Sequence, residues 1–215
     1  MKKTVLAFSL IAIGFASNAQ VSNFEGFSAG LNLASISGST KFGVGNNNTN
    51  PTIDGVGKQA WTGQVQAGYG IQMSTSSVFT IGAKYGLSAS KIGTLTFDDG
   101  SLSAKAKNQL SLEFAPGTLL NDKTLAYGII SYERAKLVGD FTDNTVAPAV
   151  NSSRSANVKG SGYGAGIRTM LDNKTYFQVE VKQINYGATS LVTADGDLNF
   201  TTKAAVGTIG IGKKF

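Results

Sequence analysis

The sequence of 215 residues contains neither cysteine nor histidine. Without cysteine the chain forms no disulfide, and without histidine it lacks the commonest metal ligand and the commonest general base. Zinc sites and hydrolytic triads that depend on histidine are therefore excluded in their usual forms. Charged residues make up only 15% of the chain. The basic ones are scattered along it without a cluster, so we do not expect nucleic acid as a partner.

Long apolar runs are also scarce. The run at positions 5–15 follows a basic start, and Ser17-Asn18-Ala19 behind it supplies small residues where a signal peptidase reads. The alternative is a membrane anchor, but a helix that crosses a bilayer needs about 20 apolar residues, and this run has about 11. We therefore expect residues 1–19 to be a cleaved signal peptide and the mature chain to begin at Gln20.

The mature chain then spans residues 20–215, a length that fits one domain. Its net charge is +4, with 17 basic and 13 acidic residues, because only Lys2 and Lys3 leave with the signal. No stretch of it is long and apolar enough for a transmembrane helix. If it spans a membrane, it must do so as a closed β-barrel, because only closure leaves no backbone group unpaired in lipid.

Apolar and polar residues alternate with a period of two in eight segments, which predicts β-strands and not helices. The clearest segment is 61–73, where Trp61 and Val65 share one face and Gln64 and Gln66 share the other. The remaining segments are 27–33, 79–88, 104–114, about 124–137, 162–171, 177–182 and 205–215.

The segment 124–137 allows two registers toward lipid. One set of outward residues is Leu125, Tyr127 and Ile129, and the other is Ala126, Gly128, Ile130 and Tyr132. We favour the second set, because the first continues into Ser131 and Glu133.

The connections alternate in length, as in an outer-membrane barrel with short periplasmic turns and long surface loops. Those at 73–78 and 171–175 are short, and that at 115–123 is moderate. The longer polar ones are 36–58, 89–103, 138–158 and 187–199, and several contain Asp-Gly, a hairpin-turn signal. All three prolines, Pro51, Pro116 and Pro148, fall in connections.

The aromatic residues are expected at two depths. An even number of strands places both chain ends on the periplasmic side. A periplasmic girdle is then predicted from residues at the periplasmic strand ends, namely Phe27, Phe79, Phe114, Phe177 and Phe215. Trp61 and Tyr163 are predicted to belong to the outer girdle.

The mature chain resembles small eight-stranded outer-membrane β-barrels of the porin and opacity-protein family, with an OmpA-like transmembrane domain. The resemblance is carried by residues 112–117, 121–128, 162–168 and 179–182 and by the terminal Phe215. It implies an all-β antiparallel barrel in the cell outer membrane, in contact with lipid and lipopolysaccharide. It also implies that the barrel-assembly machinery recognises Phe215 as an assembly signal, although Lys213 stands where the family usually has an aromatic residue.

In this family an interior network of opposed charges often plugs or gates the lumen. The residues predicted to form it are Lys84, Glu113, Arg168, Glu180 and Lys182, and Lys105 and Lys107 are expected on the inner face as well. Two interpretations remain open, a gated ion path and a set of charges that satisfy one another. We favour the second, because an eight-stranded interior has room only for side chains and an unpaired buried charge is costly.

The function we expect is that of a non-enzymatic barrel that contributes structure and surface display, with possible weak pore activity. The alternatives are adhesion or ligand binding through the surface loops, a barrel enzyme acting on lipid or peptide, and a secreted soluble barrel holding an apolar ligand. The alternating glycines at 160–166 lack the following helix of a nucleotide site. We expect no catalytic residue, no metal and no cofactor, and the sequence does not identify a loop ligand.

Overall fold

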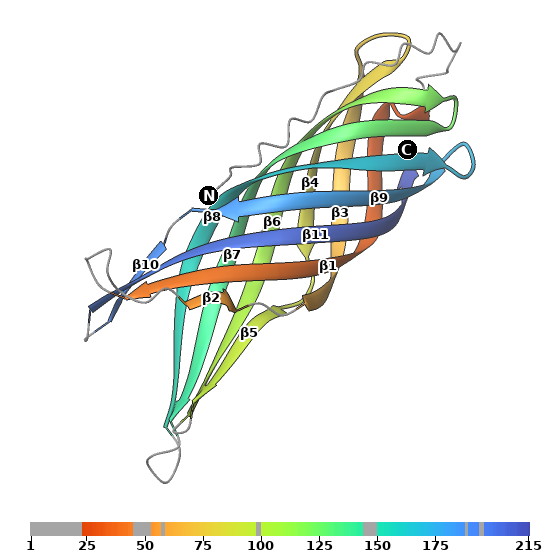
Figure 1. The fold of residues 1–215 in the computed structure, drawn as a ribbon. Coiled ribbons are helices and arrows are strands. Elements are labelled where there is room, and N and C mark those ends of the chain that lie inside the picture. Colours follow the sequence, from red (N-terminus) through yellow and green to blue (C-terminus); the bar gives the residue numbers. More distant parts are fainter. Residues whose placement is uncertain are drawn as a thin grey trace.

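The computed structural model describes residues 23–44, 53–56, 59–97, 100–143, 150–187, 189–193 and 196–215, so the expected signal peptide lies outside the described residues. The described residues form a closed antiparallel barrel (Figure 1). Eight strands build its wall: β1 (Gly26–Val44), β3 (Gln59–Gln72), β4 (Ser77–Gly86), β6 (Gly100–Asn121), β7 (Thr124–Asp143), β8 (Val150–Met170), β9 (Thr175–Tyr186) and β11 (Gly196–Lys214). Pairing of β1 with β11 closes the barrel, which confirms the predicted fold.

Three shorter strands extend the wall at the outer end: β2 (Ile53–Val56), β5 (Ser90–Phe97) and β10 (Thr189–Thr193). They pair with β1, β6 and β11 and continue the lines of β3, β4 and β9 beyond a break. The long loops predicted from the sequence are therefore shorter than expected. Backbone hydrogen bonds keep pairing the strands above the membrane, where the apolar alternation that marks a lipid-facing strand is no longer needed.

The opposite end of the barrel carries three short turns, at residues 73–76, 122–123 and 171–174. The first and third were predicted as short periplasmic connections, whereas the moderate connection expected at 115–123 is shorter than predicted, because β6 continues to Asn121. In the turn at 171–174 the carboxylate of Asp172 accepts hydrogen bonds from the amides of Lys174, at 2.7 Å, and Thr175, at 2.6 Å. These hydrogen bonds hold the pKa of Asp172 below its usual value, because they favour the charged form.

The prediction that no proline lies in a strand is wrong for Pro116, while Pro51 and Pro148 lie outside the described residues. Pro116 is inside β6 and pairs with Phe79 of β4. The ladder between β6 and β7 skips from the Phe114–Ile130 pair to the Gly117–Tyr127 pair. The missing proline N–H therefore coincides with an interruption of the ladder, and β6 continues to a tight turn.

The outer face of the barrel is apolar, and the inner face holds the polar side chains. Leu31, Ile130 and Val181 are more than 60% exposed, whereas Gln178 is fully buried. Leu125, Tyr127 and Ile129 all point inward, so the register favoured for the segment 124–137 is confirmed. An apolar exterior suits lipid and not water, so the alternative of a secreted soluble barrel is wrong. The described residues contain no helix long and apolar enough to cross a membrane.

A β-bulge in β6 corrects the expected positions of Lys105 and Lys107. The register shifts between the Lys107–Lys136 and Leu110–Arg134 pairs, and Asn108 adopts a φ of 51° there. One extra residue reverses the inward and outward alternation beyond it. Ala106 is therefore buried, Lys107 is exposed on the outer face, and the expectation that the two lysines line the lumen is wrong.

Candidate functional site in the barrel lumen

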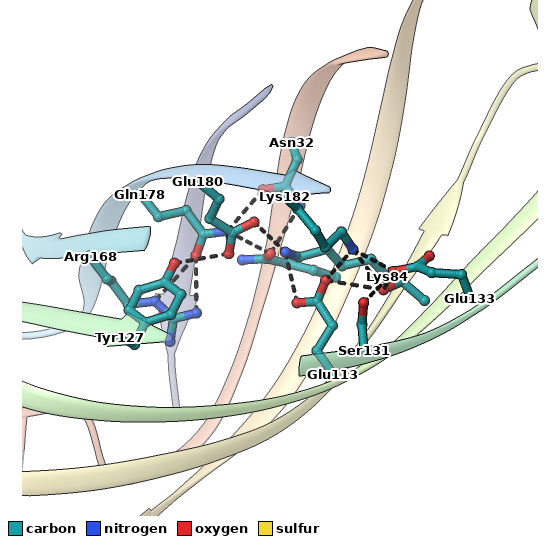
Figure 2. A network of polar contacts seen from close by, with 12 residues as sticks. Asn32, Lys84, Glu113, Tyr127, Ser131, Glu133, Arg168, Gln178, Glu180 and Lys182 are labelled. Atoms are coloured by element: carbon teal, nitrogen blue, oxygen red, sulfur yellow. Dashed lines mark hydrogen bonds and ion pairs between the residues drawn. The ribbon is translucent and has the colours of Figure 1, made fainter. Parts of the chain in front are cut away.

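A chain of alternating charges crosses the lumen (Figure 2). It joins Glu180 to Lys84, Lys84 to Glu113, Glu113 to Lys182 and Lys182 to Glu133. The Lys84–Glu113 and Lys182–Glu113 ion pairs are 2.8 Å long, and the Lys182–Glu133 pair is 2.7 Å. All five side chains are less than 10% exposed. They come from β4, β6, β7 and β9, because the narrow barrel lets opposite walls touch.

Hydroxyl groups complete the coordination of the carboxylates. Ser111 and Ser131 donate hydrogen bonds to Oε1 of Glu133, at 2.8 and 2.6 Å. Tyr127 donates to Oε1 of Glu180 at 2.9 Å. Glu133 was not among the predicted network residues. Glu133 is two residues from Ser131 and therefore shares its face of the strand, and this spacing could have identified it as an inward residue.

Arg168, which the sequence assigned to the network, occupies a separate layer below the ion pairs. Its Nε and Nη2 donate to Oε1 of Gln178 at 3.2 and 3.0 Å, and its guanidinium lies 4.4 Å from the ring centroid of Tyr176. Gln178 in turn donates to Gln66 at 2.8 Å, and Gln66 accepts from Asn32 at 2.9 Å. The arginine is thus held by an amide layer and an aromatic face and takes no part in the ion pairs among the described residues.

The alternating glycines of β8 make room for this packed interior. A Cβ atom at Gly166 would lie 2.6 Å from the ring of Tyr127, and one at Gly162 would lie 2.3 Å from Oγ of Ser131. Both contacts are closer than any real side chain tolerates. The glycines therefore serve close packing inside a narrow barrel, and β8 is followed by another strand, β9, and not by a helix.

Small cavities lie on both sides of the charged layer. One of about 30 Å³ is lined by residues that include Arg168 and Leu125, and one of about 50 Å³ by residues that include Gln64 and Ile184. Lys84 contributes to the walls of both. Each has room for about one to a few water molecules, because a single water needs roughly 10–15 Å³ of this volume.

Apolar side chains fill much of the interior above and below the charges. One cluster near the periplasmic turns gathers Phe24, Val78, Ala115, Leu119, Leu125, Tyr127, Ile129, Met170 and Tyr176. A second one, on the outer side, gathers Ala34, Ile36, Ile184, Ala204 and Val206. Apolar clusters therefore flank the charged layer on both sides, and side chains occupy the path that an ion would take.

Phe215, the predicted assembly signal, lies at the periplasmic end of the barrel with its side chain 71% exposed. Its amide donates to the carbonyl of Phe27 at 2.9 Å, and the two rings lie 5.8 Å apart. Phe79 and Phe114 form a similar pair at 5.1 Å. These adjacent outward rings fit the expected periplasmic girdle, and the exposed ring of Phe215 adds little to packing.

Deletion of Phe215 is expected to reduce insertion into the outer membrane of cells while folding into detergent micelles remains largely intact. The ring is exposed, so the folded barrel loses little when it is removed. Heat-modifiable mobility on gels, compared between membrane fractions and protein refolded in detergent, measures both effects. Phe177→Ala, which removes an outward aromatic from inside a strand, is the control. Normal surface levels of the deletion variant would show that Phe215 is not the assembly signal.

Comparison with known proteins places the chain in a family. A model of the outer membrane protein beta-barrel domain matches residues 6–213, so the protein belongs to that family and resides in the outer membrane. The structure resembles the outer membrane protein OprG from Pseudomonas aeruginosa, with 12% identity, a TM-score of 0.60, and coverage of 93% of this chain and 99% of that chain. It also resembles the outer membrane protease OmpT from Escherichia coli, with 8% identity, a TM-score of 0.54, and coverage of 89% and 97%. Curated proteins gave no match.

Proposed function

We propose that this protein is a non-enzymatic outer-membrane barrel with a lumen closed at rest, and that it acts through the β-hairpins it displays at the cell surface. The chain of ion pairs from Glu180 to Glu133 is the observation that carries the proposal. It spans the lumen with buried, mutually bonded side chains. The extension of β6, β7 and β8 beyond the lipid-facing band supports the display role.

The electrostatics of the network favour a static plug. Lys84 and Lys182 each contact two carboxylates, so neither moves without leaving buried charge unpaired. The effective penalty for an ion without a partner in such a setting is several kcal/mol. Transient opening is therefore rare, and conduction through the plug is expected to be weak.

The same contacts argue against catalysis in the lumen. Nζ of Lys182 lies 3.0 Å from Oγ of Ser111, a spacing at which a neutral lysine activates a serine nucleophile. Two carboxylates hold this lysine, and their charges favour the ammonium form, which cannot accept the serine proton. Both side chains are also buried in the plug, away from a substrate in the membrane or at the surface.

In planar bilayers the unmodified protein is expected to give small or no conductance steps, because the plug fills the lumen. Glu113→Ala is expected to produce measurable steps or to lower stability, since it removes the carboxylate that both lysines share. Phe177→Ala, on the lipid face, is the control and leaves the conductance unchanged. A large, steady conductance of the unmodified protein would overturn the closed barrel and favour a pore.

A further inference from the structure

Four basic residues that are scattered in the sequence lie together on the outer wall of the barrel. Arg134 of β7 is directly opposite Lys159 of β8, and Lys136 of β7 is directly opposite Lys107 of β6. All four side chains are exposed. The strands that carry them run side by side in Figure 1. We call these four residues the outer basic patch.

The outer basic patch begins where the lipid-facing band ends. Tyr132 precedes Arg134 by two residues on the outward face of β7, and on β8, which runs the opposite way, Tyr163 follows Lys159 on the outward face. Outward tyrosines mark the membrane interface of a barrel, so the patch lies at the level of the outer-leaflet headgroups. Long basic side chains placed there extend along the wall toward the headgroups.

The charges of the patch have no ion-pair partner within the described part of the protein. None of its four residues forms an ion pair with a described residue. Asp140, higher on β7, is engaged by Lys105 at 2.8 Å and by Ser153 at 2.9 Å. Like charges directly opposite each other on paired strands destabilise a sheet. An anion from outside the chain would relieve the repulsion within these two pairs, which lie side by side.

We propose that the outer basic patch binds the phosphate groups of outer-leaflet lipid, the chemical class to which lipopolysaccharide belongs. Arginine and lysine form charge-assisted hydrogen bonds with phosphate, and Arg134 can do so in a bidentate manner. The acyl chains of such a lipid lie against the apolar wall below, formed by Leu112, Ile130 and Tyr132. A phosphate held by the basic side chains, with its acyl chains against the apolar wall, belongs to a lipid and not to a free solute.

The test uses the full mature chain folded in a neutral detergent, with the thermal unfolding midpoint measured as lipid is added. The probe is lipid A with both phosphates, and the comparison lipid is the same molecule after enzymatic removal of the phosphates. The variant is Arg134→Gln with Lys136→Gln, which removes one member of each like-charge pair. The matched control is Lys123→Gln with Lys203→Gln, which removes the same charge from exposed positions elsewhere.

The midpoint of the unmodified protein and of the control is expected to rise with phosphorylated lipid and not with dephosphorylated lipid. The apparent affinity of the patch variant is expected to fall about tenfold, and its binding to depend less on salt. Without lipid, the variant is expected to unfold at the same temperature as the unmodified protein or above it, because repulsion within the patch is relieved. If these residues had only a structural role, the variant without lipid would unfold at a lower temperature than the unmodified protein.

Three results would overturn the proposal. They are equal binding of the dephosphorylated lipid, an equal loss of affinity in the control variant, and stabilisation by inorganic phosphate or by sucrose octasulfate at the same anion concentration. The last would identify a soluble anion as the occupant. If the double variant does not fold, Lys159→Gln examined by native mass spectrometry for co-purified phosphorylated lipid gives the same decision. These measurements do not depend on whether the lumen conducts.

Discussion

Replacement of Lys84 by methionine is expected to lower the free energy of unfolding by about 3–5 kcal/mol, because removing one partner leaves buried charge uncompensated. Lys84 is bonded to both Glu113 and Glu180. After the change Glu113 keeps Lys182, but Glu180 retains only neutral donors such as Tyr127. Urea unfolding in detergent or vesicles measures the effect, and the fluorescence of Trp61, the single tryptophan, follows the loss of lipid contact.

A second substitution separates lost charge from lost packing. Lys84→Met combined with Glu180→Gln is expected to be more stable than Lys84→Met alone, since the glutamine carries no unpaired charge in the same space. Lys203→Met, at an exposed position, is expected to change stability by no more than about 0.5 kcal/mol. Equal losses in the single and double variants would mean that Glu180 is not the charge that Lys84 compensates.

Arginine at Val65 is expected to destabilise the barrel by about 2–4 kcal/mol, the cost of a cation on the lipid face near the bilayer midplane. Val65 points outward and pairs with Leu31, midway along the apolar band of β3. Ile81 and Val179 are equivalent positions on β4 and β9. The measurement is reversible unfolding of each variant in lipid vesicles.

Two control substitutions change either the depth of the arginine in the membrane or the face of the strand that carries it. Ser37→Arg, on the outward face of β1 beyond the apolar band, is expected to cost about 0–1 kcal/mol because it lies near the interface. Gln66→Arg places the charge inside the lumen, beside Asn32 and Gln178, and is expected to act by crowding. The cost of Gln66→Arg is therefore expected to be independent of bilayer thickness, whereas the cost of Val65→Arg is expected to depend on it. Equal costs at Val65 and Ser37 would contradict the position of the membrane.

The sequence by itself determined the eight strands, the two faces of each and the choice of lipid over water. These follow from the alternation of residues such as Trp61 and Gln64, because the side chains of a strand point in opposite directions at every step. The register of β7 was also within reach, since Ser131 and Glu133 identify its inward face. Local chemistry of this kind needs no knowledge of which strand is a neighbour.

The tertiary structure decided which residues meet. Because of the bulge at Asn108, Lys105 and Lys107 lie on the outer face and not on the inner face, and the alternation of residues does not predict this bulge. Arg168 was expected among the ion pairs but lies in an amide layer, while Glu133 takes the place at the end of the charge chain. Scattered basic residues became one patch only through strand pairing. Contacts across a lumen or between strands depend on register and closure, which are properties of the whole sheet, whereas the direction of a side chain depends only on its own strand.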